Sequence, residues 1–145
     1  MLTNRRARFD YDLLEKVEAG LVLTGSEVKS LRRGGGSIAE AYARFRDGEA
    51  FIEGATIPIY EEASYNNHTI DRSRKLLLHR REIEALRIAV ERRGLTVVPL
   101  RLYFKDGRAK VELALGRGRK RHDKRQAIAE RDAKREMDRA LRGRR

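Results

Sequence analysis

At 145 residues, 40% of them hydrophobic, the chain is large enough for one modest core, so we expect one domain with an appendage. It contains no Cys and only three scattered His, which argues against a disulfide framework and a structural zinc site. The net charge of +12 favours a polyanionic partner, and the lack of a long apolar segment predicts a cytoplasmic protein without a membrane span.

Most of the excess positive charge lies in the last fifth of the chain. From Gly116 onward, 13 Lys and Arg residues accompany five Asp and Glu residues, which gives this segment +8 of the total of +12. We therefore divide the chain into a folded domain, 1–115, and a basic C-terminal tail, 116–145.

The N-terminal third begins with a basic arm and is expected to contain two helices. Apolar residues three positions apart predict a short helix over 10–19, with Gly20 at its end. A brief strand at 21–23 and a second helix at 27–33 follow, and a run of three glycines ends that helix.

The middle of the chain is expected to hold a hairpin and a polar loop. The Asp-Gly pair at 47–48 suits a type I′ turn and joins the predicted strands 42–46 and 49–54. Loose alternation at 57–60 favours another strand. The segment 61–74 is polar and has no period, so we expect an exposed, mobile loop.

The remaining part of the domain is predicted to add a helix and a second hairpin. Residues 76–78 lead into a helix with apolar residues at helical spacing, capped by Gly94. Apolar residues then alternate from Val98 to Phe104 on one face, and again over 111–115, around an Asp-Gly turn at 106–107. The pattern predicts a mostly β protein with antiparallel hairpins and flanking helices.

The tail differs from the domain because it lacks a face that could be buried. Residues 123–141 are rich in helix formers, yet their apolar side chains make only a broken stripe. An isolated helix of this length is marginally stable. We therefore expect the tail to be disordered when free and helical on an anionic partner.

No combination of residues points to catalysis. The glycines at 34–36 follow a predicted helix and lack the spacing of a phosphate-binding loop, and the adjacent Glu61 and Glu62 fit a solvated loop. We expect a protein that is not an enzyme and that uses no cofactor, metal or small-molecule substrate.

Three clusters instead combine the cations, flat side chains and donors that RNA binding needs. They are Arg5, Arg6, Arg8, Phe9 and Tyr11 in the arm; Arg72, Arg74, Lys75 and His79 in the loop; and Gly116, Arg117, Gly118, Arg119, Lys120 and the residues up to Arg125 at the start of the tail. In the third cluster the glycines allow the backbone to approach a phosphate chain. The alternatives are core packing for the aromatic residues and a solvated charge run for the loop.

Six strings, in order along the chain, together resemble the small protein B family, the SsrA-binding proteins of bacteria. They are NRRARFDY (4–11), EAGLVLTGSEVKSLR (18–32), DGEAFI (47–52), RKLLLH (74–79), GLTVVPLRLYFKDGRAKVELAL (94–115) and GRKRHDKR (118–125). Each string alone is weak, whereas six in order are specific.

The resemblance implies an antiparallel β-barrel of the oligonucleotide-binding type with flanking helices. It also implies binding to the tRNA-like domain of transfer-messenger RNA and delivery of that RNA to stalled ribosomes for trans-translation. In this family the tail resembles an mRNA mimic that enters the empty mRNA path near the decoding region of the small subunit and becomes helical there. The resemblance places Asp123, Lys124 and Arg125 at the start of that helix.

Eight residues match the positions at which the family contacts RNA. They are Tyr11, Glu18, Lys29, Arg72, Arg74, Lys75, Leu77 and His79. Because a carboxylate repels phosphate, Glu18 would have to accept from a base amino group or a 2′-hydroxyl. A charge on a helix surface is the alternative for Glu18, and core packing is the alternative for Leu77. Phe9 departs from the family, which often has His there.

Two other classes of protein share this composition. A ribosomal structural protein is also small, basic and tailed, and it would stay bound to every isolated subunit at high salt. A general RNA chaperone would bind transfer-messenger RNA and unrelated structured RNA equally well at one salt concentration.

Overall fold

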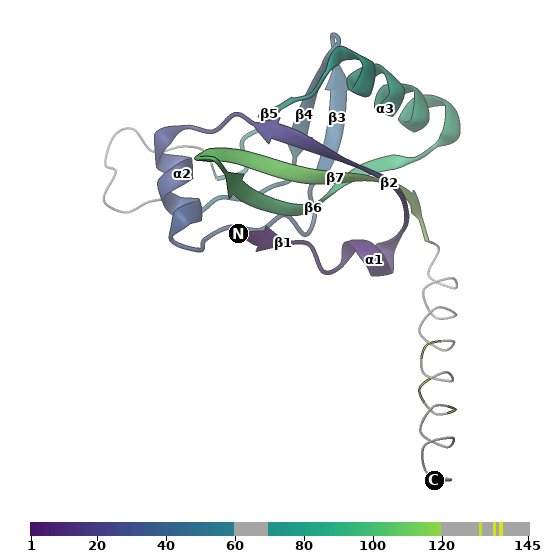
Figure 1. The fold of residues 1–145 in the computed structure, drawn as a ribbon, viewed down its shortest axis with the longest axis horizontal. Helices are drawn as coiled ribbons and strands as arrows, with labels where there is room; N and C mark the ends of the chain where they lie inside the picture. The colour runs from purple at the N-terminus through teal and green to yellow at the C-terminus, as the bar shows by residue number, and fades with distance from the viewer. Residues whose placement is uncertain (60–69, 120–130, 132–134, 136, 138–145) are drawn as a thin grey trace.

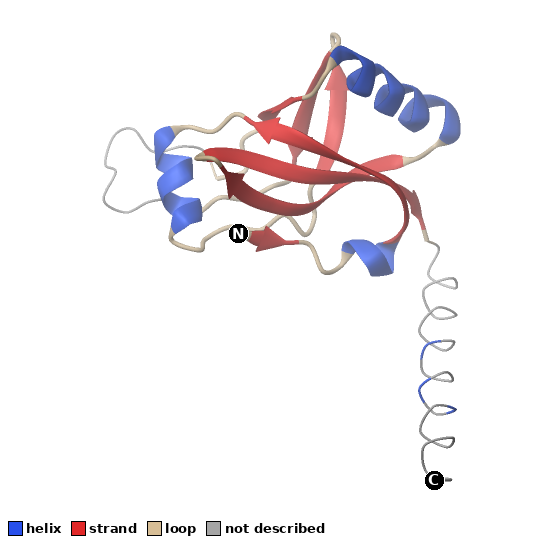
Figure 2. Cartoon of the chain, viewed as in Figure 1, coloured by secondary structure: helices blue, strands red, loops and turns tan. Residues whose placement is uncertain are grey.

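A strongly curved antiparallel sheet forms the body of the protein, with helices at its margins (Figures 1 and 2). The computed structural model describes residues 1–59, 70–119, 131, 135 and 137. The elements in these ranges are β1 (Leu2–Thr3), α1 (Ala7–Asp10), β2 (Tyr11–Leu21), α2 (Gly25–Arg32), β3 (Tyr42–Arg46), β4 (Glu49–Glu53), β5 (Arg74–Leu77), α3 (Arg80–Arg93), β6 (Thr96–Lys105) and β7 (Arg108–Gly118).

The strand order is β1-β6-β7-β2-β5-β4-β3, and every neighbouring pair is antiparallel. The sheet coils back on itself until β3, at one edge, lies beside β6. The result is a partly open barrel, which confirms the expected mostly β fold of the oligonucleotide-binding type with flanking helices. Within the described residues, no helix is both long and apolar enough to cross a membrane.

Both predicted hairpins are confirmed, and their turns explain why they could be predicted locally. Asp47 and Gly48 have φ of 52° and 74°, and Asp106 and Gly107 have φ of 52° and 75°. Positive φ at both central residues is the requirement of a type I′ turn, which Asp-Gly meets at low cost. The helix that ends at the left-handed Gly94 is also confirmed as α3.

The helix expected over 10–19 is wrong, because most of this segment is the long strand β2. A β-bulge between Leu13 and Lys16 shifts its register against β7. Beyond the bulge, alternate residues from Val17 to Leu21 pack against the core. The three-residue apolar spacing imitates a helical period, but pairing along β7 decides the conformation. The strand expected at 21–23 overlaps β2 only at Leu21.

The segment before α3 also differs from the expectation. Residues 74–77 form β5, which pairs with both β2 and β4, so the strand begins inside the expected loop. Residues 57–59 form no strand, although Ile57 is buried and its N–H donates to the carbonyl of Ile70 over 2.9 Å. The rest of the expected mobile loop, 60–69, lies outside the described residues.

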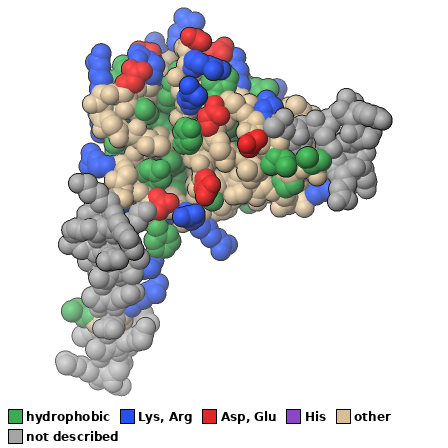
Figure 3. Space-filling view, turned by 180° about the vertical axis from the view of Figure 1, so that it is seen from behind, with side chains coloured by type: hydrophobic (Ala, Val, Ile, Leu, Met, Phe, Trp, Pro, Cys, Tyr) green, Lys and Arg blue, Asp and Glu red, His purple; other side chains and the backbone are tan. Residues whose placement is uncertain are grey.

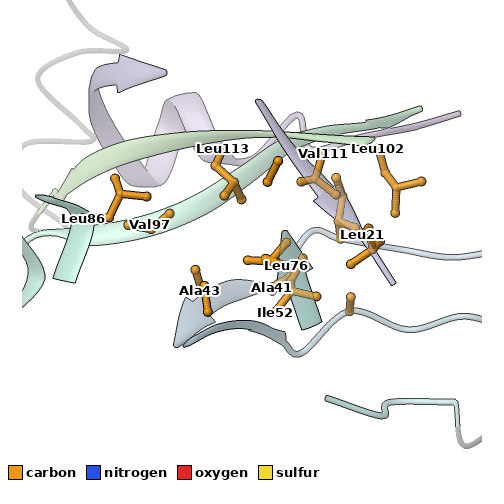
Figure 4. Packing of buried hydrophobic residues seen from close by; sticks show 14 of the residues in the cluster. Leu21, Ala41, Ala43, Ile52, Leu76, Leu86, Val97, Leu102, Val111 and Leu113 are labelled. Carbon is orange, nitrogen blue, oxygen red and sulfur yellow. The ribbon is translucent and has the colours of Figure 1, made fainter. Parts of the chain in front are cut away.

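The core is shared by every strand of the barrel. Side chains such as Ile52, Leu76, Val111 and Leu113 converge inside it, each with at most 1% of its surface exposed (Figure 4). Burial of a side chain of this size stabilises the fold by about 1.5–3 kcal/mol. The main cluster therefore holds the strands that carry the candidate site.

A second, smaller cluster lies under α1 and corrects the expected face of β6. The register of β6 against β7 shifts between Pro99 and Arg101, so strict alternation fails there. Val98 and Leu100 consequently pack in the small cluster, whereas Leu102 belongs to the main core. The expectation that all alternate residues from Val98 to Phe104 share one face is wrong for this reason.

The strand β7 continues through Gly118, beyond the expected end of the domain at Leu115. The N–H of Arg119 then donates to the carbonyl of Asp10 over 2.9 Å. Gly116 and Gly118 therefore belong to the barrel. The tail positions Lys120, Asp123, Lys124 and Arg125, and the expected change from disorder to helix, lie outside the described residues.

Candidate nucleic-acid interface

A groove of about 610 Å³ opens on the outer face of the barrel, where β2, β5 and β7 meet the β3–β4 turn and the start of α3. It brings together four of the predicted RNA contacts, which are Glu18, Lys75, Leu77 and His79. These residues come from two distant parts of the sequence. Only the antiparallel pairing of β2 with β5 places them side by side.

The alternation of β5 decides which of its side chains reach the groove. Arg74 and Leu76 are buried, whereas Lys75 and Leu77 point outward. Leu77 is 54% exposed and lies on Gly20, where an added Cβ would be 3.1 Å from the Cβ of Leu77. Leu77 thus presents apolar surface to the groove, and core packing, the alternative for this residue, is wrong.

Arg74 requires a correction, because its side chain has no exposed surface with which to contact RNA. Its Nε donates to Oε2 of the buried Glu27 over 2.5 Å. Its two other nitrogens donate to the carbonyls of Ala55, Arg72 and Ile70 over 2.9–3.0 Å. These carbonyls lie on both sides of the segment 60–69. Arg74 therefore holds the ends of this segment together instead of binding phosphate.

Glu27 is the centre of a group that we call the clamp, which consists of the buried Glu27 and Arg74 and the half-buried Arg72. Its Oε1 accepts from Nη2 of Arg72 over 2.6 Å and from the N–H of Thr24, the N-cap of α2, over 2.9 Å. Burial alone would raise the pKa of Glu27, but the hydrogen bonds from Arg72, Thr24 and Arg74, and the charge of Arg74, lower this pKa to about 2. Arg72 thus also forms an ion pair with Glu27.

Glu18 has a different setting, since it lies in a strand and not on the expected helix surface. Its Oε2 accepts a hydrogen bond from the hydroxyl of Tyr103, and Nζ of Lys105 lies 3.9 Å from its Oε1. The Tyr103 hydrogen bond is the main cause that lowers the pKa of Glu18. The same bond raises the pKa of Tyr103 to about 12. Glu18 is therefore an ionised acceptor at the edge of the groove.

The groove is not uniformly basic. Three cations, Lys75, Arg80 and Lys110, line it together with the carboxylates Glu18, Glu49 and Glu82. Nζ of Lys75 lies 3.1 Å from Glu49, and Glu82 accepts from the N–H of His79, the N-cap of α3, over 3.0 Å. Basic and acidic side chains are also interspersed over the upper end of the molecule seen from behind (Figure 3). Such a surface suits selective hydrogen bonding better than non-specific attraction to phosphates.

A second cavity, of about 600 Å³, lies beside the N-terminal arm and is predominantly basic. Its charged lining residues are Arg5, Arg8, Lys16, Arg101 and Glu112. The predicted contact Arg5 is exposed here, and Arg6, which lines a separate cavity, is also exposed. The cavity and the groove are joined across the sheet, because Glu112 of β7 lies directly opposite Glu18 of β2.

The arm is held in place by Asn4, which is 7% exposed. Its amide nitrogen donates to the carbonyls of Ile38 over 3.2 Å and of Pro99 over 2.9 Å. Its Oδ1 accepts from the N–H of Ala7, the first residue of α1, over 3.2 Å. A fully bonded buried amide of this kind fixes the arm against the barrel.

The start of β2 packs against the end of β7 instead of standing free. The ring of Tyr11 covers Gly116, where an added Cβ would lie 2.9 Å from the Cβ of Tyr11. Nε of Arg119 donates to Oδ1 of Asp12 over 2.9 Å, so this cation is already paired. Further along the chain, the guanidinium of Arg131 lies 5.5 Å from the ring centre of Phe9.

The predicted contacts therefore separate into groups. Glu18, Lys75, Leu77 and His79 meet in the groove, and Arg5, Arg6 and Tyr11 lie near the arm. Lys29 is exposed on α2 and is not among the residues that line the groove in the described part of the chain.

Sequence reasoning missed Asn4, Glu27, Arg80, Tyr103 and Lys110. Only Glu27 carried a local signal, because it stands three residues after Thr24, the spacing of a capping box. Tyr103 and Lys110 reach this region through pairing between strands, which the sequence alone does not reveal.

A partly open antiparallel barrel with a mixed groove, a basic cavity and an excess positive charge defines a nucleic-acid-binding protein of the oligonucleotide-binding class. The family model for the SmpB protein matches residues 1–143. The chain therefore belongs to the SmpB family, as the six sequence strings indicate.

Its relatives are similar over nearly their whole length. The SsrA-binding protein of Parafrankia sp. is 59% identical over 138 residues, which are 95% of this chain and 87% of that protein. That of Deinococcus radiodurans is 58% identical over 135 residues, 93% of this chain and 94% of that protein. A solved structure, described as tmRNA-SmpB on a journey to the center of the bacterial ribosome, matches with a TM-score of 0.70 and 49% identity, covering 87% of this chain and 92% of that one.

Proposed function

We propose that this protein binds the tRNA-like domain of transfer-messenger RNA and delivers it to stalled ribosomes for trans-translation, which rescues the ribosome and tags the nascent chain for proteolysis. Membership of the SmpB family across residues 1–143 is the observation that carries this proposal. Relatives named SsrA-binding proteins and a solved relative described with tmRNA and the bacterial ribosome support it. The protein acts in the cytoplasm by binding, without catalysis and without a cofactor.

In this proposal the basic cavity and the groove have different roles in RNA binding. Arg5, Arg8 and Lys16, with Arg6 nearby, attract the phosphate chain and supply most of the salt-dependent affinity of the domain. The groove supplies selectivity through the apolar surface of Leu77 and the acceptor Glu18, with Lys75 and His79 beside them. Tyr11 and Lys29 are further contacts of the same RNA.

The tail has a separate partner in this proposal. We assign it to the empty mRNA path of the small subunit, near the decoding region, with Lys120 and Asp123 to Arg125 at its start. The boundary lies after Arg119 instead of Leu115, because β7 extends through Gly118. A chain that ends at Arg119 should keep its affinity for the tRNA-like domain and lose tagging activity. Loss of RNA affinity on truncation would contradict this division.

Sequencing the RNA that copurifies with the full-length protein tests the main proposal. We expect one abundant transfer-messenger RNA, recovered with stalled ribosomes in preference to empty subunits. Stable association with every small or large subunit at high salt would instead indicate a ribosomal structural protein. Equal recovery of unrelated structured RNAs at the same salt concentration would indicate a general RNA chaperone.

A further inference from the structure

Two carboxylates lie directly opposite each other on the outer face of the barrel, in the strip that joins the basic cavity to the groove. Glu18 of β2 is paired in register with Glu112 of β7. Like charges at directly opposite positions destabilise an antiparallel pair. This arrangement therefore needs compensation from neighbouring side chains.

The third strand, β6, supplies that compensation to both carboxylates. Nη2 of Arg101 lies 3.0 Å from Oε2 of Glu112, and the Arg101 guanidinium also lies 5.2 Å from the ring centre of Tyr103. Tyr103 donates its hydroxyl hydrogen to Glu18, and Lys105 lies near the other oxygen of Glu18. Alternate residues of β6 thus compensate the two carboxylates: Arg101 pairs with Glu112, whereas Tyr103 and Lys105 contact Glu18.

Glu18 lines the groove, whereas Tyr103 is not among the described residues that line it. Its hydrogen bond to Glu18 therefore gives Tyr103 an indirect route to a ligand in the groove. The hydrogen bond occupies part of the acceptor capacity of one oxygen of Glu18, and a carboxylate offers about four lone-pair sites in all. Acceptor capacity remains for a ligand, and the orientation of the carboxylate is already fixed.

We propose that Tyr103, assisted by Lys105, is a positioning residue that holds the Glu18 carboxylate ready to accept hydrogen bonds from donor groups of RNA in the groove. This inference rests on the proposed function. The donors are the amino and imino groups of an unstacked base or a ribose 2′-hydroxyl, because these are the groups of RNA that a carboxylate can recognise. The lowered pKa of Glu18 and the raised pKa of Tyr103 agree with a bond from a neutral phenol to an ionised carboxylate.

A double-mutant cycle on the full-length protein tests the coupling. The probe is a transcript of the tRNA-like domain of a bacterial transfer-messenger RNA. We expect Tyr103→Phe to weaken its binding about five-fold, the effect of one side-chain hydrogen bond. We expect Glu18→Ala to weaken it about ten-fold or more, and Tyr103→Phe to have no further effect in the Glu18→Ala background.

Two measurements separate this role from a structural one. Tyr103→Phe should leave the dependence of affinity on salt concentration unchanged, because it removes no phosphate contact, whereas Lys110→Ala should reduce the slope by about one. Tyr42→Phe is the matched control, since it removes the hydroxyl of an exposed tyrosine on β3 that does not line the groove. Its affinity should equal that of the wild type.

Modified RNA identifies the donor. In tRNA-like domains assembled from synthetic strands, each loop nucleotide is replaced in turn by analogues in which the base amino group is removed, as in inosine for guanosine, the base imino hydrogen is replaced by methyl, or the ribose is 2′-deoxyribose. The five-fold difference in affinity between the wild type and Tyr103→Phe should disappear when one particular group of the RNA is modified. That group is then the donor to Glu18. If the difference persists with every modification, Glu18 receives no hydrogen bond from loop RNA and the inference is wrong.

The outcomes distinguish the inference from the function on which it rests. If the wild-type protein does not bind the transcript, the proposed function fails and the inference fails with it. If the wild type binds and Tyr103→Phe binds equally well, only the inference is overturned. An equal weakening by Tyr103→Phe with and without Glu18 would also overturn it, because Tyr103 would then act independently.

Discussion

Two glutamates in this basic protein, Glu27 and Glu18, have lowered pKa values for different structural reasons. Glu27 belongs to the clamp and has no exposed surface, and it accepts hydrogen bonds from two arginines and one backbone N–H. Glu18 lies on the exposed strip of β2, where the described residues provide one hydrogen bond, from Tyr103.

This difference shows how a structural carboxylate can be told from one that is available to a ligand. The criterion is how many of its hydrogen-bond acceptor sites are not used within the fold. The lone pairs of Glu27 are largely used within the fold, so its charge stabilises the N-terminus of α2 and the ends of the segment 60–69. Glu18 keeps acceptor capacity at the edge of the groove. Variants of the two residues should therefore separate effects on stability from effects on RNA binding.

The largest effect is expected from breaking the clamp at Arg74. Arg74→Met leaves the charge of Glu27 buried without its one fully buried partner, and it should lower the free energy of unfolding by about 3–5 kcal/mol. Lys75→Met is the matched control, because Lys75 is exposed and its pair with Glu49 is solvated, so the change should be below about 1 kcal/mol. Urea denaturation measures both variants. Equal unfolding midpoints would contradict the structural role of Arg74.

The next largest effect is expected on the pH dependence of the free energy of unfolding, through Glu27. The pKa of Glu27 is about 2 in the native protein and near 4.5 in the unfolded chain, so the unfolded state binds more protons between these values. The stabilisation by Glu27 is complete above pH 4.5 and is lost as the pH falls towards 2. Glu27→Gln should cost about 1.5–3 kcal/mol at neutral pH and flatten the pH dependence in this window.

Denaturation by urea at a series of pH values checks this expectation. Glu40→Gln changes an exposed glutamate outside the clamp and should retain the wild-type slope. A Glu27→Gln variant that loses stability as steeply as the wild type on acidification would show that another group controls this transition.

Local signals in the sequence account for the features that could be predicted. The Asp-Gly turns require positive φ at two adjacent residues, and Gly94 ends α3 in the left-handed conformation, so a few residues determine each feature. The helix α2 was also predictable and begins slightly earlier than expected, at Gly25, because Thr24 caps it.

Features that depend on strand pairing could not be predicted in the same way. The conformation of β2 is decided by β7, which follows it by about ninety residues, and its bulge produces a spacing that resembles a helix. Without β5 as a strand, nothing indicates that Arg74 points inward and Leu77 outward. Tyr103 meets Glu18 across an intervening strand, so no sequence spacing reveals the pair.

A smaller effect should distinguish the basic cavity from the groove by salt dependence. Arg5→Ala combined with Arg8→Ala removes two cations of the cavity and should reduce the slope of log affinity against log salt by about two. Leu77→Ala removes apolar surface from the groove and should weaken binding about five-fold at every salt concentration. Filter binding of the tRNA-like domain measures both. A lower slope for Leu77→Ala would contradict the assignment of selectivity to the groove.

The smallest effect on stability is expected at Glu18. Glu18→Gln removes one of two opposed carboxylates and leaves a neutral side chain on an exposed strand, so its urea midpoint should equal that of the wild type, in contrast to Glu27→Gln.

The Glu18→Gln variant should nevertheless change the pKa of Tyr103. Without the negative charge of Glu18, the pKa of Tyr103 should fall from about 12 towards 10, because the phenol no longer donates a hydrogen bond to an ionised carboxylate and its ionisation no longer sets two negative charges against each other. Ultraviolet titration of the tyrosines detects this shift, and Tyr103→Phe identifies which tyrosine titrates last. An unchanged last titration in Glu18→Gln would mean that Tyr103 is not bonded to Glu18 in solution, and the contrast between the two glutamates would rest on burial alone.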